Sequence, residues 1–189
     1  MPLAPTPGPC RRRLARLRHL AGRWWATTRR RRPQPDDVAW ARSLLSPAEA
    51  ALWCRLSPAD QAHAVDVARA TETAFETAVE GGAPFGGVGL RTALSAALLH
   101  DIGKVDAPAG ATARVAATLL RPLPRRMLRR LAPVARLLDY PRHGAALLAA
   151  AGSDDIVAAW AAEHHRDPDD WTIDHGLGAV LAHADDRAR

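Results

Sequence analysis

Apolar residues recur every three to four positions through residues 36–189, which is the spacing of one buried face of an α-helix. No stretch alternates apolar and polar residues for long enough to predict a strand. The pattern predicts helices over residues 57–80, 90–99, 143–151, 153–165 and 173–185, and Arg-rich helical pieces broken by prolines over 112–138. We therefore expect an all-α fold, a helical bundle.

Two of the predicted helix starts carry capping signals. Ser46-Pro47-Ala48-Glu49 has the residues of a capping box with Pro at the first helical position, and Ser57-Pro58-Ala59-Asp60 repeats it with a shorter acid. Gly81-Gly82 marks the end of the long helix that Ser57 begins.

Composition supports a packed domain preceded by a separate basic segment. Of the 189 residues, 48% are hydrophobic, which is enough to bury a core. The net charge of +6 is uneven, because residues 1–35 hold ten Arg and no acid, whereas residues 36–189 hold 16 basic and 20 acidic residues. We interpret residues 1–35 as a disordered or amphipathic tail and residues 36–189 as the helical domain. Such a tail is typical of segments that bind nucleic acid or anionic membrane, and equally of solvated tails without a partner.

The chain shows no pattern of an exported or membrane-spanning protein. The apolar residues of 14–26 are interrupted by three Arg, and no run approaches the roughly 20 apolar residues of a membrane helix. We expect a cytoplasmic protein, with peripheral membrane attachment through the tail as an option. The two cysteines, Cys10 and Cys54, are far apart, which argues against a disulfide scaffold or a cysteine zinc site.

An acidic residue lies on the apolar face of a predicted helix. Asp101 continues the stripe of Leu94, Ala97 and Leu98, and His100 precedes it. A buried carboxylate is costly unless it is paired or bound to a metal. In the metal-free protein we expect the charge of Asp101 to have little compensation.

Other helices carry ligand-type side chains in similar positions. His63 lies on the stripe of Ala59 and Val67, and His164 continues Ile156 and Trp160. On the last helix Asp185 lies at the edge of the apolar stripe, whereas Asp186 and His183 lie off it and should face solvent.

Each of these residues alone has an ordinary explanation. An inward His is commonly hydrogen-bonded to a carbonyl, and an Asp near a helix end commonly caps the next helix. A set of such residues from four helices instead favours one or two divalent metal ions, namely Mn, Mg, Fe, Ni, Co or Zn.

The order of these residues resembles the H…HD…D signature of the HD superfamily of metal-dependent phosphohydrolases. The resemblance rests on His63, the pair His100-Asp101 within Leu-Leu-His-Asp-Ile-Gly-Lys, and Asp185, and it covers about residues 57–186. It implies an HD-domain-like helical bundle with a metal site between its helices.

The same resemblance implies roles for individual residues. One ion would be held by His63, His100, Asp101 and Asp185. The pair His164-His165 resembles the additional histidines of members that bind two or more metals, with Asp101 as the bridge. Asp101 and Lys104 are the expected catalytic residues, Lys104 by neutralising charge on the phosphate; its alternative role is that of an exposed lysine at a helix end.

The chain departs from the HD-GYP branch of that family at three places. Ala59 stands where a Glu is usual, and the Gly-Tyr-Pro motif is absent. Where many relatives have a His-Pro, this chain has Tyr140-Pro141. Either Tyr140 has replaced a ligand, or His143 supplies one from a shifted position.

Three functions follow as hypotheses. The first is an enzyme that hydrolyses a phosphate mono- or diester of a small, nucleotide-like molecule. The second is a non-catalytic HD-fold domain that senses a ligand or binds a partner. The third places the main activity in the basic tail, which would contact nucleic acid or anionic membrane. No pattern in the sequence predicts an oligomeric state.

Overall fold

The computed structural model describes residues 32–106 and 139–188, in which every regular element is helical. Within these ranges there are seven α-helices and no strand. The α-helices are α2 (Pro35–Leu44), α3 (Pro47–Trp53), α4 (Pro58–Glu80), α5 (Leu90–Leu99), α9 (Tyr140–Ala150), α10 (Asp155–Glu163) and α11 (His175–Arg187). Three short 3-10 helices join them: η1 (Phe85–Gly87), η2 (Ile102–Asp106) and η3 (Pro168–Asp170). The all-α prediction is confirmed for these residues.

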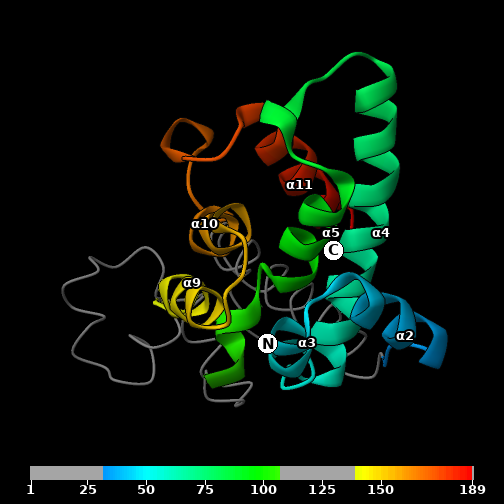
Figure 1. The fold of residues 1–189 in the computed structure, drawn as a ribbon, viewed down its shortest axis with the longest axis vertical. Helices are drawn as coiled ribbons and strands as arrows, with labels where there is room; N and C mark the ends of the chain where they lie inside the picture. The colour runs from blue at the N-terminus through cyan, green and yellow to red at the C-terminus, as the bar shows by residue number, and fades with distance from the viewer. Residues whose placement is uncertain (1–31, 107–138, 189) are drawn as a thin grey trace, which may run out of the picture.

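Helix α5 is the centre of the bundle, with α4, α10 and α11 packed around it (Figure 1). Seven of its ten residues are buried, including Leu94, Leu98 and Leu99. The facing helices contribute Val67, Trp160, Leu177 and Leu181 to the same core. Since α5 is covered by several helices, the residues at its C-terminal end are placed deep inside the molecule.

The predicted capping signals are both present. The Ser46 hydroxyl accepts from the Glu49 amide and the Glu49 carboxylate accepts from the Ser46 amide, which completes the capping box of α3. The Ser57 hydroxyl accepts from the Asp60 amide at the start of α4. The long helix ends at Glu80, before Gly81, as the sequence predicts.

The later helices differ from the prediction in where they begin. Helix α9 starts at Tyr140 rather than 143, because Pro141 fits in the first turn, where no amide donor is needed. Helices α10 and α11 start later than predicted, since Asp154 and Asp174 accept the first amide hydrogen bonds. Helix α2, which begins with Pro35 and has two acidic residues in its first turn, is not among the predicted helices. The expected tail helix and the Arg-rich pieces at 112–138 lie outside the described residues.

A backbone-to-backbone contact joins η2 to the start of α9. A Cβ atom on Gly103 would lie 1.8 Å from the Tyr140 carbonyl oxygen, and one on Gly144 would lie 2.9 Å from the Gly103 nitrogen. Only glycines allow so close an approach. The contact brings the beginning of α9 against the segment that follows His100-Asp101.

None of the described helices combines the length and apolar character that crossing a membrane would require.

Candidate metal centre

The sequence-predicted ligands form two adjacent groups at the centre of the bundle. The first group is His63, His100 and Asp185, and the second is Asp101, His164 and His165. Within each group, one ligand atom from every residue lies within 4.8 Å of the others. The structure thus brings together six of the seven residues proposed as metal ligands, from α4, α10, α11 and the C-terminal end of α5.

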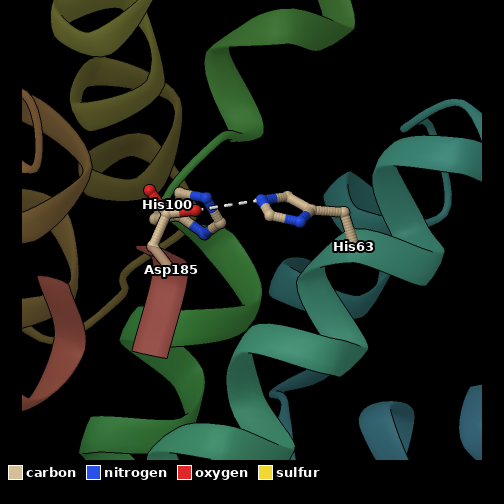
Figure 2. A group of neighbouring side chains, drawn as sticks. All are labelled: His63, His100 and Asp185. Atoms are coloured by element: carbon tan, nitrogen blue, oxygen red, sulfur yellow. Dashed lines mark hydrogen bonds and ion pairs between the residues drawn. The ribbon is translucent and has the colours of Figure 1, made fainter. Parts of the chain in front are cut away.

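The first group joins three helices (Figure 2). His63 on α4 places Nε2 at 3.1 Å from Oδ1 of Asp185 on α11. The His63 ring meets the His100 ring edge to face, with centroids 5.6 Å apart. His100 and Asp185 are buried, and the His63 side chain is 17% exposed, so the group is reached from the α4 side.

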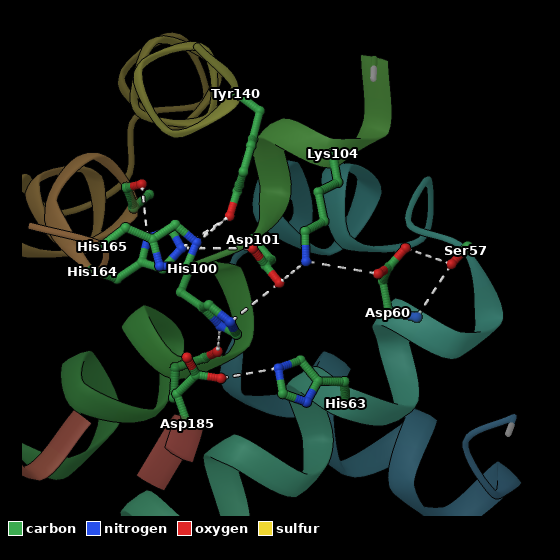
Figure 3. A network of polar contacts seen from close by, with 12 residues as sticks. Ser57, Asp60, His63, His100, Asp101, Lys104, Tyr140, His164, His165 and Asp185 are labelled. Carbon is green, nitrogen blue, oxygen red and sulfur yellow. Dashed lines mark hydrogen bonds and ion pairs between the residues drawn. The ribbon is translucent and has the colours of Figure 1, made fainter. Parts of the chain in front are cut away.

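The second group sits at the ends of α5 and α10, below the start of α9 (Figure 3). Asp101 follows the C-cap residue of α5, and His164 is itself the C-cap of α10. The His164 side chain is buried beneath Tyr140, whereas His165 is exposed. The negative ends of two helix dipoles therefore face this region, which favours a cation.

His100 and His164 are oriented in the same way by their own helices. Nδ1 of His100 lies 2.7 Å from the Ala97 carbonyl, and Nδ1 of His164 lies 3.1 Å from the Ala161 carbonyl. Since a carbonyl accepts only from an N–H, each Nδ1 carries a proton, so Nε2 is the atom that bears the lone pair when the ring is neutral. This is the tautomer that a metal ligand needs.

Asp101 connects the two groups. Its Oδ2 lies 3.4 Å from Nε2 of His100, and its Oδ1 lies 3.6 Å from Nε2 of His164. Oδ1 is fully buried and accepts no hydrogen bond. A buried carboxylate oxygen without a hydrogen bond is costly, and a bound cation would remove that cost.

The charge of Asp101 is nevertheless compensated, contrary to our expectation. Lys104, on η2, places its ammonium in contact with Oδ2. Burial acts to raise the pKa of Asp101, but Lys104 and His100 hold that pKa well below its ordinary value. The carboxylate is therefore ionised over the physiological range.

The two buried imidazoles have opposite pKa shifts. Burial acts to lower the pKa of His100, but the Asp101 carboxylate raises that pKa above the ordinary histidine value. Burial dominates at His164 and lowers its pKa. A metal ion at His100 therefore competes with a proton that Asp101 favours, whereas burial favours the neutral form of His164 that a metal ion binds.

Sequence reasoning missed the second carboxylate beside Lys104. Asp60 is buried, and its Oδ1 lies 3.9 Å from the Lys104 Nζ atom. Its Oδ2 accepts a 2.5 Å hydrogen bond from the Ser57 hydroxyl. The only signal in the sequence was the helix cap, which predicts that Ser57 contacts Asp60 but not that Asp60 faces Lys104.

The alternatives at Tyr140 and His143 have different positions. The Tyr140 hydroxyl lies 2.6 Å from Nε2 of His165 and 3.3 Å from Nε2 of His164. His143 lies apart from both groups, with Nε2 2.7 Å from Oδ2 of Asp106 and a side chain 46% exposed. The inward position thus belongs to Tyr140. His183 and Asp186 on α11 are exposed, as the helix pattern predicted.

The distances fit bound metal ions. Two ligand atoms about 2.1 Å from one ion, at angles between square and tetrahedral, are about 2.9–3.4 Å apart. The His63–Asp185 and His100–Asp101 separations of 3.1 and 3.4 Å fall in that range, and the His164–Asp101 separation of 3.6 Å is slightly longer. Together with the buried Asp101 oxygen that accepts no hydrogen bond, this geometry makes the two His/Asp groups a candidate metal centre.

In comparisons with known proteins, no family model, curated protein or solved structure matches this chain.

Proposed function

We propose that this protein is a metal-dependent phosphohydrolase that cleaves a phosphate mono- or diester of a small, nucleotide-like molecule. The observation that carries the proposal is the contact of Asp101 with both imidazole groups, beside the only lysine of the chain. The resemblance of the His63, His100-Asp101 and Asp185 pattern to the HD superfamily supports the reaction class.

The first group would hold one ion through His63, His100 and Asp185, and the second would hold another through His164 and His165. Asp101 would contribute one oxygen to each ion. Divalent ions in such sets lower the pKa of a bound water and polarise a phosphoryl oxygen. Nitrogen and oxygen ligands without thiolates suit Mn, Mg, Fe, Ni, Co or Zn.

Lys104 would bind the phosphate. Its ammonium lies between Asp101 and Asp60, and its side chain is 23% exposed. When a metal ion takes over part of the Asp101 charge, Lys104 is released to contact a phosphoryl oxygen. Asp60, fixed by Ser57, then holds the ammonium beside the site.

The test is metal analysis of the purified full chain, followed by a panel of phosphomonoesters, phosphodiesters and nucleotides in Mn²⁺ and in Mg²⁺. We expect stoichiometric metal and hydrolysis that a chelator abolishes. His63→Gln should lower both metal content and rate by at least tenfold. His183→Gln, at an exposed position on α11, is the matched control and should change neither.

The second candidate function is a non-catalytic metal-binding domain. The Tyr140 hydroxyl favours this candidate, because the hydroxyl lies on the second group, where an entering substrate or water could bind. Stoichiometric metal with no hydrolysis across the panel would support this candidate. Absence of metal would contradict both.

A further inference from the structure

Tyr140 is the residue that the resemblance leaves without a role, and it is the one best placed to add a donor to the second group. Its hydroxyl oxygen is within 3.3 Å of two imidazole nitrogens, Nε2 of His164 and Nε2 of His165. In the metal-free protein the hydroxyl can donate to one of these nitrogens and accept from the other, so its oxygen already faces both imidazoles.

The position of the Tyr140 oxygen matches that of a fourth ligand. The separation of 3.3 Å from His164 lies within the range expected for two donors on one ion, and the 2.6 Å to His165 is slightly short of it. His164 has its Nε2 lone pair directed away from Ala161, toward Asp101 and the Tyr140 hydroxyl. Asp101, His164, His165 and Tyr140 then form a complete four-donor set.

The fold holds Tyr140 in this place. Tyr140 is the first residue of α9 and is buried, with 9% of the residue exposed. The glycine contact between η2 and α9 presses the Tyr140 backbone against Gly103. Tyr140 is therefore positioned by packing and not by a flexible loop.

We propose that Tyr140 is a metal ligand through its phenolate oxygen, and that the second group consequently binds ferric iron. A phenolate and a carboxylate are two hard anionic oxygen donors, which suit a small trivalent ion better than a divalent one. The first group has one carboxylate of its own, Asp185, and keeps its preference for a divalent ion. On binding, the Tyr140 O–H bond breaks, its proton passes to water, and an Fe–O bond forms without change in the oxidation state of the iron.

This inference rests on the proposed two-ion site, but it has a readout independent of hydrolysis. Phenolate bound to ferric iron gives a charge-transfer absorption in the visible range, and excitation in that band enhances the ring vibrations of the phenolate in the Raman spectrum. Tyr140 is the only tyrosine of the chain, so any such signal must come from it.

The experiment loads the full chain with ferric citrate, removes unbound iron, and records iron content, visible absorption and resonance Raman spectra. We expect a coloured protein whose band and phenolate vibrations are lost in Tyr140→Phe, with iron content lowered by less than twofold. His143→Gln, on the same helix but facing Asp106, is the matched control and should keep the band.

Three results would overturn the inference: bound iron without a visible band, a band that persists in Tyr140→Phe, or failure to bind ferric iron. None of them decides the proposed function, because hydrolysis in Mn²⁺ or Mg²⁺ and its loss in His63→Gln are measured separately. If no phosphoester is hydrolysed but the visible band is present, the proposed phosphohydrolase function is contradicted and the assignment of Tyr140 as a metal ligand is supported.

Discussion

Asp101 is a buried carboxylate for which several partners compete. It is buried, it contacts imidazoles of both groups, and it is paired with Lys104. The helix pattern predicted the burial of Asp101 but not its pairing with Lys104. In the structure the helix ends at Leu99, and the turn into η2 folds the ammonium back onto the carboxylate.

Replacing Asp101 by Asn separates metal binding from folding. The amide keeps the shape of the side chain, but it removes the charge that an ion needs and the partner of Lys104. We expect Mn²⁺ to raise the melting temperature of the wild type, since an ion that binds only the native state adds about 2.7 kcal/mol at 100 times its Kd. In Asp101→Asn the metal-dependent shift and the hydrolysis should both disappear.

The metal-free variant should also be less stable than the metal-free wild type, by about 1–3 kcal/mol, because a charged hydrogen bond is lost. Calorimetry with and without Mn²⁺ measures both effects. Asp186→Asn, at the exposed position after Asp185, should alter neither. Full metal-dependent hydrolysis by Asp101→Asn would refute the assigned role.

At the scale of elements, apolar spacing predicts the long helices well and their ends less well. Helix α4 follows the pattern because a buried stripe, a serine cap and a glycine stop all agree, and α5 follows it because seven of its ten residues are buried. The starts of α10 and α11 were misplaced because several polar residues in each loop could cap, and only the folded loop selects Asp154 and Asp174.

In the candidate site, too, some positions could be predicted from the sequence and others could not. Positions on a single helix, such as His63, Asp185 and the exposed Asp186, could be predicted because helix geometry alone determines the face. The positions of Tyr140 and His143 could not, because they depend on how α9 docks onto η2. That docking depends on the Gly103–Gly144 approach, which joins residues 41 positions apart in the sequence.

His143 has a structural role that follows from this docking. It joins α9 to Asp106 at the end of η2, and Arg55, which follows α3, binds the other oxygen of the same carboxylate at 2.9 Å. The hydrogen bond from His143 is the main reason that the pKa of Asp106 lies below its ordinary value, and Arg55 adds to it.

We expect His143→Ala to raise the pKa of Asp106 toward the ordinary carboxyl value. A carboxyl with a lowered pKa in the folded state stabilises the fold above its unfolded-state pKa, and that stabilisation is lost as the pH falls through the folded-state pKa. The wild type should therefore lose more stability than the variant below about pH 4. The effect is small because Asp106 is largely exposed.

An NMR titration of the Asp106 carboxyl carbon measures this pKa directly, and urea unfolding at neutral and acidic pH measures its effect on stability. Arg142→Ala removes a neighbouring exposed charge on α9 and is the control. An unchanged Asp106 pKa in His143→Ala would show that the contact does not persist in solution.

At the scale of the whole molecule, charge is divided unevenly along the chain. Residues 1–35 carry ten Arg without an acid, whereas the remainder has four more acidic than basic residues. A second basic stretch without acids, at 112–138, contains seven Arg. Residues 1–31 and 112–138 lie outside the described residues, so the two stretches are compared by replacing their charges.

We expect residues 1–35 to bind anionic polymers and surfaces independently of the metal centre. The full chain should bind duplex DNA and vesicles containing anionic lipid at low salt, because neutralising phosphates releases counterions. Replacing the ten Arg of residues 1–35 by Gln should weaken this binding at least tenfold and flatten its salt dependence. The phosphoester rate in Mn²⁺ should stay the same.

The matched control replaces the seven Arg of 112–138 by Gln. Fluorescence anisotropy with labelled DNA and vesicle co-sedimentation, each over a salt series, compare the two variants with the wild type. If the control variant loses binding and the tail variant does not, the second basic stretch is the anionic contact. Equal binding by both variants and the wild type would rule out an electrostatic role for either stretch.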